Sequence, residues 1–572
     1  MSFDSTAPAA GYVAAVVDAV QQYLTASPGR TVLLGIVYTP IIIFVLNILK
    51  QLVVPRDPSL PPEVFHWIPF VGSSIAYGDD PLKFFFECRE KYGDVFTFTL
   101  LGRKVTVALG AKGNNFVLGG KSTAFSAEDA YTHLTTPVFG KDVVYDVPNE
   151  VFMEQKKFVK VGLSTENFRA YVGMFEQEVD DYMRTDQAFI IWQMDDINEW
   201  GRFDVTDVMA QITILTASRT LQGKEVRSGL DKSFSALYND LDGGFTPLNF
   251  MFPNLPLESY RRRDVAHKKM SEYYTDIIRK RRESGHSDEP DMISALMDQK
   301  YRDGRPLRDH EIAHIMIALL MAGQHTSSAS GSWTLLHLAQ NVEVQEALYQ
   351  EQVDHFGNPD GSFRPMTYEG FRQLPVLDSV IRETLRMHPP IHSIMRYVRS
   401  DVPVPATLAA PSKDGVYVVP KGYYVLASAA VSQVDPLIWV NPTKWDPTRW
   451  SDPEGVAAQA FKTYSDENGE KIDYGFGAVS KGTESPYQPF GAGRHRCIGE
   501  QFAYLQLGTV ISNIIRKVEL RLEDGITEIP EHNYHVRPFS SSSLLSIVNN
   551  PSIDHDHNAK ETSECLLQTQ EI

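Results

Sequence analysis

One cysteine in this sequence stands in surroundings that favour its deprotonation. Cys497 lies in the glycine-rich segment 490–500 (FGAGRHRCIGE), and the apolar periodicity that follows predicts a helix over residues 501–518. A thiol near a helix N-terminus has a lowered pKa, because free N–H groups and the helix dipole favour an anion. A thiolate held in this way can ligate haem iron of the oxygen-activating kind, whereas a lone cysteine is usually a small buried hydrophobe. Three glycines without a Cβ would let a flat ligand approach the backbone here: Gly491, Gly493 and Gly499.

The spacing Phe-x-x-Gly-x-(Arg/His)-x-Cys-x-Gly in this segment resembles the haem-binding loop of the cytochrome P-450 superfamily. Most of that superfamily has Arg where His495 stands, so the match holds with the His variant allowed. The resemblance implies a mainly α fold with a smaller β part, and haem b as cofactor, its iron bound axially by the thiolate of Cys497. The residues that carry the match, and that it assigns to the cofactor, are Phe490, Gly493, His495, Cys497 and Gly499.

Charge and cysteine usage exclude several classes of function. The chain has 572 residues, a formal charge of −18 and an apolar fraction of 43%, so a large core is possible and general nucleic-acid binding is not expected. Basic runs such as 261–263 and 279–282 are more simply solvated helix faces. Three scattered cysteines give no disulfide framework and no C-x-x-C zinc site, which suits a reducing compartment. No G-x-G-x-x-G motif occurs, so reducing equivalents are expected from another protein.

The N-terminal region has the pattern of a membrane anchor. Residues 32–49 are uncharged and mostly Leu, Ile and Val, which is just long enough to cross a bilayer as a helix. Pro40 would kink this helix, and the alternative is a buried core helix. Residues 1–31 form a possible amphipathic segment, and residues 50–65 a stiff proline-rich linker. The basic residues after the span weakly favour a cytoplasmic body.

The body, residues 66–550, reads as one catalytic domain followed by a polar tail over 551–572. Periodicity predicts a helix over 81–92, short strands over 94–101 and 104–110, and mainly helices from about 150 to 350. Acidic residues open a long helix over 309–340, another helix covers 368–387, and strands lie over 416–419 and 423–427. The polar, glycine-rich stretch 451–485 is interpreted as a surface insertion.

Two further motifs agree with the haem interpretation. An E-x-x-R pair lies about 110 residues before the cysteine, and the resemblance implies that it forms a buried ionic triad of structural role, made by Glu383, Arg386 and Arg449. In the long helix, the segment 322–327 (AGQHTS) matches the superfamily's oxygen-activating element. A Thr326 hydroxyl bonded one turn back would loosen the helix, and Thr326 and His325 are the expected catalytic residues for proton transfer. Read alone, His325 could equally be a satisfied helix histidine.

The His-Thr pair and the segment 131–146 (YTHLTTPVFGKDVVYD) resemble the sterol 14α-demethylases, especially the fungal ones, and the resemblance runs from about residue 55 to 550. Haem has two carboxylates that need donors when shielded from water. The resemblance assigns these to Tyr131, Tyr145, Lys156, Arg396 and His495. It also implies an apolar sterol channel, with His325 near the sterol hydroxyl or the proton route, lined by Tyr131, Phe139, Tyr145, Phe245, Pro247, Phe250, Ile391 and Ser393.

The function expected from this resemblance is removal of the 14α-methyl group of lanosterol or eburicol in ergosterol synthesis, by three oxidations that release formate. Electrons would come from an NADPH-cytochrome reductase docked on the cysteine side. The expected setting is the endoplasmic reticulum membrane, with one span, a cytosolic catalytic domain and a monomeric catalytic unit. Two alternatives remain: a monooxygenase of the same fold acting on another sterol or a fatty acid, and a non-enzymatic membrane haem carrier or sensor.

Overall fold

The computed structural model describes residues 28–187, 189–190, 200–230, 232–245, 249, 252–284, 291–465, 472, 474–476, 481–523, 529 and 544–549. Within these ranges, the side chains of residues 28–31, 33, 35, 232, 233, 235 and 544–549 are not described. Most of the expected N-terminal amphipathic segment, the polar tail after residue 550, and the channel residues Pro247 and Phe250 lie outside the described residues.

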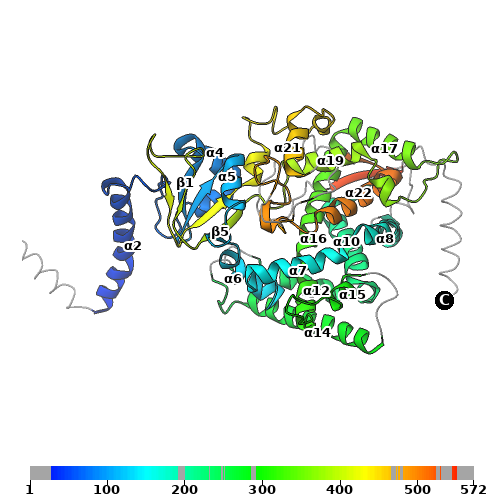
Figure 1. Cartoon of the computed structure of the whole chain (residues 1–572), viewed down its shortest axis with the longest axis horizontal. Coiled ribbons are helices and arrows are strands. Elements are labelled where there is room, and N and C mark those ends of the chain that lie inside the picture. The colour runs from blue at the N-terminus through cyan, green and yellow to red at the C-terminus, as the bar shows by residue number, and fades with distance from the viewer. Residues whose placement is uncertain are drawn as a thin grey trace, which may run out of the picture.

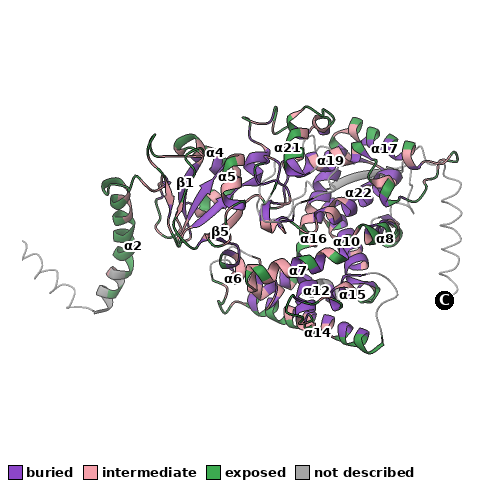
Figure 2. Cartoon of the chain, viewed as in Figure 1, coloured by how far each residue is buried: buried purple, intermediate pink, exposed green. Residues whose placement is uncertain are grey.

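Helix α2 (Pro28–Val53) stands apart from the body, at the left of Figure 1, and is longer than the span expected from the sequence. Its window Ile36–Val53 has a mean hydropathy of 1.9 and none of it is buried, as Figure 2 shows. The helix continues through Pro40. Its end is fastened to the body, because the Gln51 amide donates to the His66 carbonyl at 2.8 Å and accepts from the His66 N–H at 3.1 Å.

A β-rich part lies beside α2 in Figure 1. Its five-stranded sheet has the order β1-β2-β8-β5-β3, in which β2 and β8 run parallel and the other pairs run antiparallel. Buried valines and phenylalanines on β1 and β2 pack with Phe84 and Phe85 of α4, so the sheet has its own core. The elements are α3 (Ser74–Asp79), α4 (Pro81–Tyr92), β1 (Val95–Leu100), β2 (Arg103–Ala108), α5 (Gly110–Leu118), β3 (Phe125–Ser126), β5 (Ile394–Val398) and β8 (Tyr424–Ala427).

The larger part is helical and occupies the right of Figure 1. A second sheet of order β4-β10-β9 and a two-stranded sheet β6-β7 complete the β structure of the described residues. The remaining elements are α6 (Glu128–Phe139), η1 (Val144–Asp146), α7 (Asn149–Gly162), α8 (Thr165–Thr185), β4 (Gly201–Asp204), α10 (Val205–Ala217), η2 (Ser218–Gln222), α11 (Lys224–Ser228), α12 (Lys232–Asp242), α14 (Glu258–Ser284), α15 (Met292–Met297), α16 (Asp309–Gln340), α17 (Val342–Phe356), α18 (Tyr368–Phe371), α19 (Pro375–Met387), β6 (Val402–Pro403), β7 (Val418–Val419), α20 (Ala429–Gln433), η3 (Pro447–Trp450), α21 (Val456–Tyr464), η4 (Gly493–His495), α22 (Glu500–Lys517), β9 (Val518–Leu522) and β10 (Leu544–Asn549).

Helix α16 is the central element of the helical part. It is apolar on most sides, which is typical of a helix buried within a large core, and it contacts α10, α14 and α22. The Glu311 carboxylate accepts from the Arg308 backbone N–H at 2.7 Å, which satisfies a donor at the start of the helix. The predicted span of this helix agrees with the observed one.

Two expectations from the sequence were wrong. The single helix predicted over 368–387 is two helices, α18 and α19, because Pro375 cannot continue a preceding helix and instead begins a new one at its first position. The stretch 451–485 is not only a surface insertion. It contains α21, whose Ala457, Ala460 and Tyr464 are buried, and Ser485 and Thr483 at its other end are buried too.

Candidate active site

The loop that carries Cys497 lies between η4 and α22. The Cys497 backbone N–H donates to the Phe490 carbonyl at 2.9 Å, which closes the loop. Gly491 and Gly493 have φ angles of +68° and +70°, a left-handed conformation that favours glycine. A Cβ at Gly493 would lie 2.3 Å from the carbonyl oxygen of Leu118. The loop therefore keeps its shape, and its close approach to α5, only with glycine at this position.

The thiol of Cys497 does not have the lowered pKa expected from its position before a helix. Burial raises this pKa, while a hydrogen bond from Gly499 and the charges of Lys156 and Arg496 lower it by less. The side chain is nevertheless exposed. Both observations hold if the sulfur borders a space inside the protein. Desolvation therefore favours the neutral thiol here, and a bound metal ion would take the place of the proton and keep the sulfur anionic.

A cationic cluster lies next to this loop. Lys156 of α7 and Arg396 of β5 are 5% and 4% exposed. The Lys156 ammonium donates to the carbonyls of Tyr474 and Arg494 at 2.6 and 2.9 Å, and the Arg396 guanidinium donates to the Met395 carbonyl at 2.7 Å. No carboxylate pairs with Arg396 among the side chains that the structure describes. So much buried positive charge implies an anionic ligand.

The surroundings of His495 also indicate an anionic ligand. Its pKa is well below the ordinary value, because it is buried and because Arg396, Lys156 and Arg494 repel a further positive charge. Its Nδ1 atom is buried and has no hydrogen-bond partner in the described part of the chain. Haem brings two carboxylates, which would neutralise the cluster and could accept from this nitrogen. The residues present therefore fit the haem that the resemblance implies.

Two tyrosines border the same region. Tyr131 of α6 and Tyr145 of η1 stack with ring centroids 5.5 Å apart, and Tyr145 lies 5.9 Å from the His495 ring. The Tyr131 hydroxyl accepts from the Met395 N–H at 2.8 Å, which fixes it against β5. Burial raises the pKa of Tyr145 to about 12, and Cys497 adds to the shift. Both hydroxyls therefore remain protonated donors at neutral pH.

Helix α16 has one open stripe in an otherwise buried surface. Ala322 and His325 are exposed, whereas the intervening Gln324 is buried. A Cβ at Gly323 would meet nothing within 4 Å, so space lies beside the helix here. The Thr326 hydroxyl donates to the Ala322 carbonyl one turn back at 2.8 Å, yet the helix continues without interruption. A small molecule can therefore reach the helix at the Ala-Gly step.

Asp242 is a residue of this site that sequence reasoning missed. The His325 Nε2 atom lies 2.6 Å from the Asp242 Oδ1 atom, and the Tyr238 ring lies 5.8 Å from the imidazole. Both partners come from α12, whose last residue is Asp242. The side chains of His325 and Asp242 are 55% and 35% exposed, so the pair can exchange protons with water. No spacing or motif in the sequence links them.

The expected channel residues are partly brought together. The rings of Phe139 and Phe245 lie 5.6 Å apart and form one apolar contact. Ile391 is 58% exposed. The Ser393 hydroxyl lies 2.8 Å from His392 Nδ1, next to the start of β5.

Gly140, which ends α6, packs directly on α16. Its φ of +104° excludes most other residues, and a Cβ would lie 2.4 to 2.6 Å from the ring of His314. His314 Nδ1 lies 2.9 Å from the Lys141 carbonyl, which holds the ring in this place. A cleft of about 770 Å³ opens on this side. Its lining includes the polar residues Asp142, His267 and His310 but neither Cys497 nor Thr326, so this cleft is separate from the cysteine loop and from the open stripe of α16.

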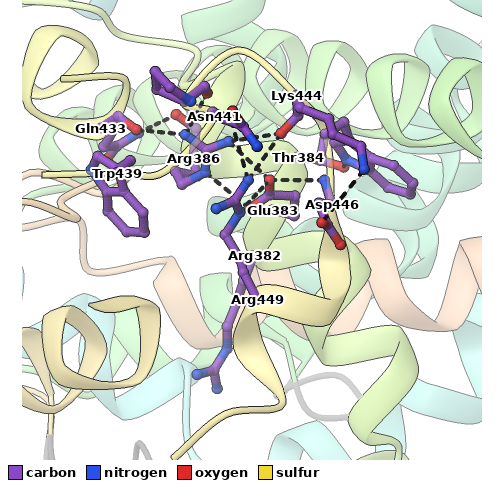
Figure 3. A network of polar contacts seen from close by, with 12 residues as sticks. Arg382, Glu383, Thr384, Arg386, Gln433, Trp439, Asn441, Lys444, Asp446 and Arg449 are labelled. Atoms are coloured by element: carbon purple, nitrogen blue, oxygen red, sulfur yellow. Dashed lines mark hydrogen bonds and ion pairs between the residues drawn. The ribbon is translucent and has the colours of Figure 1, made fainter. Parts of the chain in front are cut away.

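Behind the site, the Glu383 carboxylate is the centre of a buried polar network (Figure 3). It accepts from Arg386 at 2.8 and 2.9 Å and from Arg449 at 2.9 Å. Asp446 N–H and the Trp450 indole donate to the same carboxylate at 3.0 and 3.1 Å, which the sequence did not indicate. Glu383 and Arg386 are fully buried. The network ties α19 to η3 and braces the chain that leads to the cysteine loop.

Comparisons with known proteins agree with this site. A sequence profile described as Cytochrome P450 matches residues 61–541. The chain is 54% identical over 512 residues to lanosterol 14-alpha demethylase of Mycosarcoma maydis, covering 87% of this chain and 89% of that protein. It is 49% identical to sterol 14-alpha demethylase cyp51A of Aspergillus fumigatus, covering 91% and 96%. It is 48% identical to lanosterol 14-alpha demethylase erg11 of Schizosaccharomyces pombe, covering 88% and 95%.

Among solved structures, the retinoic acid-bound cyanobacterial CYP120A1 matches with a TM-score of 0.67 at 20% identity, covering 86% of this chain and all of that one. This likeness shows the fold alone. The fungal demethylases also show the family, because they are 48% to 54% identical to this chain and match 87% to 88% of it. The cofactor of this family is a cysteine-ligated haem, for which the cationic cluster and the open thiol are suited. The chain therefore belongs to the cytochrome P450 family and, within it, to the sterol 14-alpha demethylases.

Proposed function

We propose that this protein removes the 14α-methyl group of lanosterol or eburicol. The observation that carries this proposal is the 54% identity over 512 residues to a lanosterol 14-alpha demethylase, of which the chain covers 89%. The methyl carbon passes to an alcohol, then to an aldehyde, and is finally released as formate. Each of the three oxidations consumes one O2, two electrons and two protons. When bound, the haem supplies the oxidising iron for this chemistry.

The chain's own residues hold the cofactor in this proposal. Cys497 would ligate the haem iron, and the iron would take the place of the proton that burial otherwise favours on the sulfur. The haem carboxylates bind Lys156, Arg396 and His495, with Tyr131 and Tyr145 as neutral donors. Neutralising the two buried cations, Lys156 and Arg396, is part of the binding free energy. The loop residues Phe490, Gly493 and Gly499 are assigned to the cofactor site by the family resemblance, and a Cβ at Gly499 would have only the Cys497 sulfur nearby, at 3.8 Å.

Proton supply is assigned to His325, Asp242 and Thr326. The pair His325–Asp242 reaches solvent and stands on the open stripe of α16, so it can pass protons inward to the Thr326 hydroxyl, directly or through water. A well-placed proton donor contributes about 10²–10⁴-fold to a rate. Phe139, Phe245 and the other apolar residues of the channel orient the sterol and exclude water.

The setting of the enzyme is also part of the proposal. α2 crosses the endoplasmic reticulum membrane, because an exposed apolar helix of this length is costly in water. The body then lies on the cytosolic side as a monomer and receives electrons from an NADPH-cytochrome reductase on its cysteine side. Carbonate extraction of membranes, followed by protease protection, would test both anchoring and orientation.

The test of function uses the full chain loaded with haem and supplied with reductase and NADPH. Lanosterol and eburicol should be converted to 14-desmethyl products with one formate per sterol, and a long-chain fatty acid should be unchanged. Turnover of the fatty acid but of neither sterol would favour the monooxygenase with another substrate. Haem binding with no turnover of any of them would favour a haem carrier.

A further inference from the structure

The residue before Cys497 has an unusually complete set of contacts. Arg496 is fully buried, and its Nε and Nη2 atoms donate to the two carboxylate oxygens of Glu500 at 2.8 and 2.9 Å. Such a two-pronged pair fixes both position and orientation of the guanidinium. Arg496 and Glu500 stand on either side of the cysteine, so this ion pair closes the short turn that contains the sulfur.

Two further partners of Arg496 lie at the end of α21. The Arg496 Nη1 atom donates to the Tyr464 carbonyl at 2.6 Å, and Nη2 donates to the Ser465 hydroxyl at 2.8 Å. The guanidinium carbon also lies 3.6 Å from the centroid of the Tyr464 ring. The Tyr464 hydroxyl in turn donates to the Gly491 carbonyl at 2.8 Å. One tyrosine therefore contacts both the beginning and the end of the cysteine loop.

Residues near the end of the stretch 451–485 hold α21 in place beside Arg496. The Ser485 hydroxyl donates to the Ala460 carbonyl at 2.7 Å, which fastens α21 to the segment that leads into the loop. A Cβ at Gly482, where φ is +78°, would lie 2.9 Å from the Tyr464 carbonyl oxygen. Arg496 is therefore tightly packed between the end of α21 and the segment 481–485 that follows it.

We propose that Arg496 and Tyr464 are positioning residues for the haem ligand, and that α21 is the brace through which the stretch 451–485 acts. Arg496 holds the turn in the conformation that presents the sulfur to iron. It also neutralises Glu500, which is 2% exposed and would otherwise place an unpaired negative charge three residues from a thiolate. The inference rests on Cys497 being the haem ligand and is independent of the substrate.

Arg496→Met in the full-length, haem-loaded protein tests the proposal. The reduced carbon-monoxide difference spectrum separates thiolate-ligated from thiol-ligated haem, and the midpoint potential reports the charge on the sulfur. We expect the share of the thiolate-ligated form to fall severalfold, because the turn that holds the sulfur toward the iron loses its two-pronged ion pair and its bond to the Tyr464 carbonyl. Removing a negative charge from sulfur should also raise the potential.

Arg281→Met is the matched control. Arg281 is 4% exposed, pairs with Glu225 and Asp291, and lies on α14 away from the cysteine loop. Its loss should destabilise the protein but leave the spectrum of the folded fraction unchanged. If Arg281→Met shifts the spectrum as much as Arg496→Met, the effect is general destabilisation and the proposal is overturned.

Milder variants keep the test decisive if Arg496→Met does not fold. Arg496→Lys retains the charge but loses the two-pronged geometry, and Tyr464→Phe removes only the bond to Gly491. Both should show a smaller shift toward the thiol form. Arg496→Met combined with Glu500→Gln removes the unpaired carboxylate and should recover part of the thiolate signal. Wild-type spectra in all of these variants would overturn the proposal.

This outcome is distinguishable from a failure of the proposed function. If wild-type protein shows the thiolate spectrum but converts no sterol, only the proposed function fails. If wild-type protein demethylates sterol and every Arg496 variant keeps the thiolate spectrum and potential, only the present inference fails.

Discussion

His325 on α16 and Asp242 on α12 form a pair with 2.6 Å between imidazole Nε2 and carboxylate Oδ1, although 83 residues separate them along the chain. The pair joins solvent to the open stripe of the central helix. It gives Asp242 a defined part in the proposed proton supply, with His325 as the group that exchanges protons toward Thr326.

Asp242→Asn should therefore lower kcat by about tenfold or more while leaving haem content unchanged, because an amide cannot stabilise a protonated imidazole. The measurement is steady-state sterol turnover in H2O and D2O, with a larger solvent isotope effect in the variant. Asp240→Asn is the control, since Asp240 lies on the same helix and pairs with Arg262 instead. Equal turnover in the two variants would remove Asp242 from the proton route.

Thr326→Ala should uncouple oxygen consumption from product, because the hydroxyl that donates to the Ala322 carbonyl would no longer be available to the substrate side of the helix. We expect NADPH oxidation to continue while formate per NADPH falls. Thr334→Ala is the matched control: its hydroxyl makes the same backward bond, to the Ser330 carbonyl at 2.7 Å, in a fully buried part of α16. Unchanged coupling in Thr326→Ala would contradict the assigned role.

Glu383→Gln should destabilise the folded protein by about 3–5 kcal/mol, because it leaves the buried guanidinium of Arg386 without its counter-charge. Denaturant unfolding followed by circular dichroism would measure this, with haem loss as a second signal. Glu369→Gln removes an ion pair to Arg169 between exposed side chains and should change little. If both variants lost similar amounts of unfolding free energy, the buried Glu383 network would not be the source of the stabilisation.

Two buried histidines make stability depend on pH. Burial lowers the pKa of His314 to about 4 and that of His337 to about 3, from an ordinary value of 6.5. Below about pH 6.5 the unfolded chain binds protons that the folded protein does not, so the free energy of unfolding falls as pH decreases. Each histidine should account for about 2 kcal/mol at about pH 5.

Unfolding of the haem-free protein at several pH values measures this effect. His337→Gln should reduce the slope of the free energy of unfolding against pH by the contribution of one proton, since glutamine cannot titrate in either state. The His337 ring stacks on Trp445 at 4.8 Å, so the variant will be less stable at every pH, and only the slope is diagnostic. An unchanged slope would mean that His337 is protonated in the folded protein.

The sequence predicted best those features that depend on local pattern. The bounds of α4 and α16 agree with their periodicity, and α22 differs by one residue at each end. The ionic triad followed from a known motif, but its indole and backbone donors did not, because they come from a segment without regular spacing. The family, its fold and its cofactor were correctly identified from the cysteine loop.

What the sequence did not predict depends on three-dimensional packing. The pKa of Cys497 is raised because desolvation outweighs a helix terminus, and burial cannot be judged from neighbours in the chain. Asp242 could be found only once α12 was placed beside α16. The stretch 451–485 looked like a surface insertion by composition, yet Tyr464 is one of the largest fully buried side chains.

The absence of a Cβ atom at Gly140 determines how closely α6 can approach α16. With any larger residue there, the end of α6 would have to move away from His314, and with it the ring of Phe139, the residue directly before Gly140. The separation of α6 and α16 would then change through a position that has no side chain of its own. Because Phe139 is assigned to the proposed sterol channel, we expect substitutions at this contact between the main chain and a histidine to alter the range of sterols accepted.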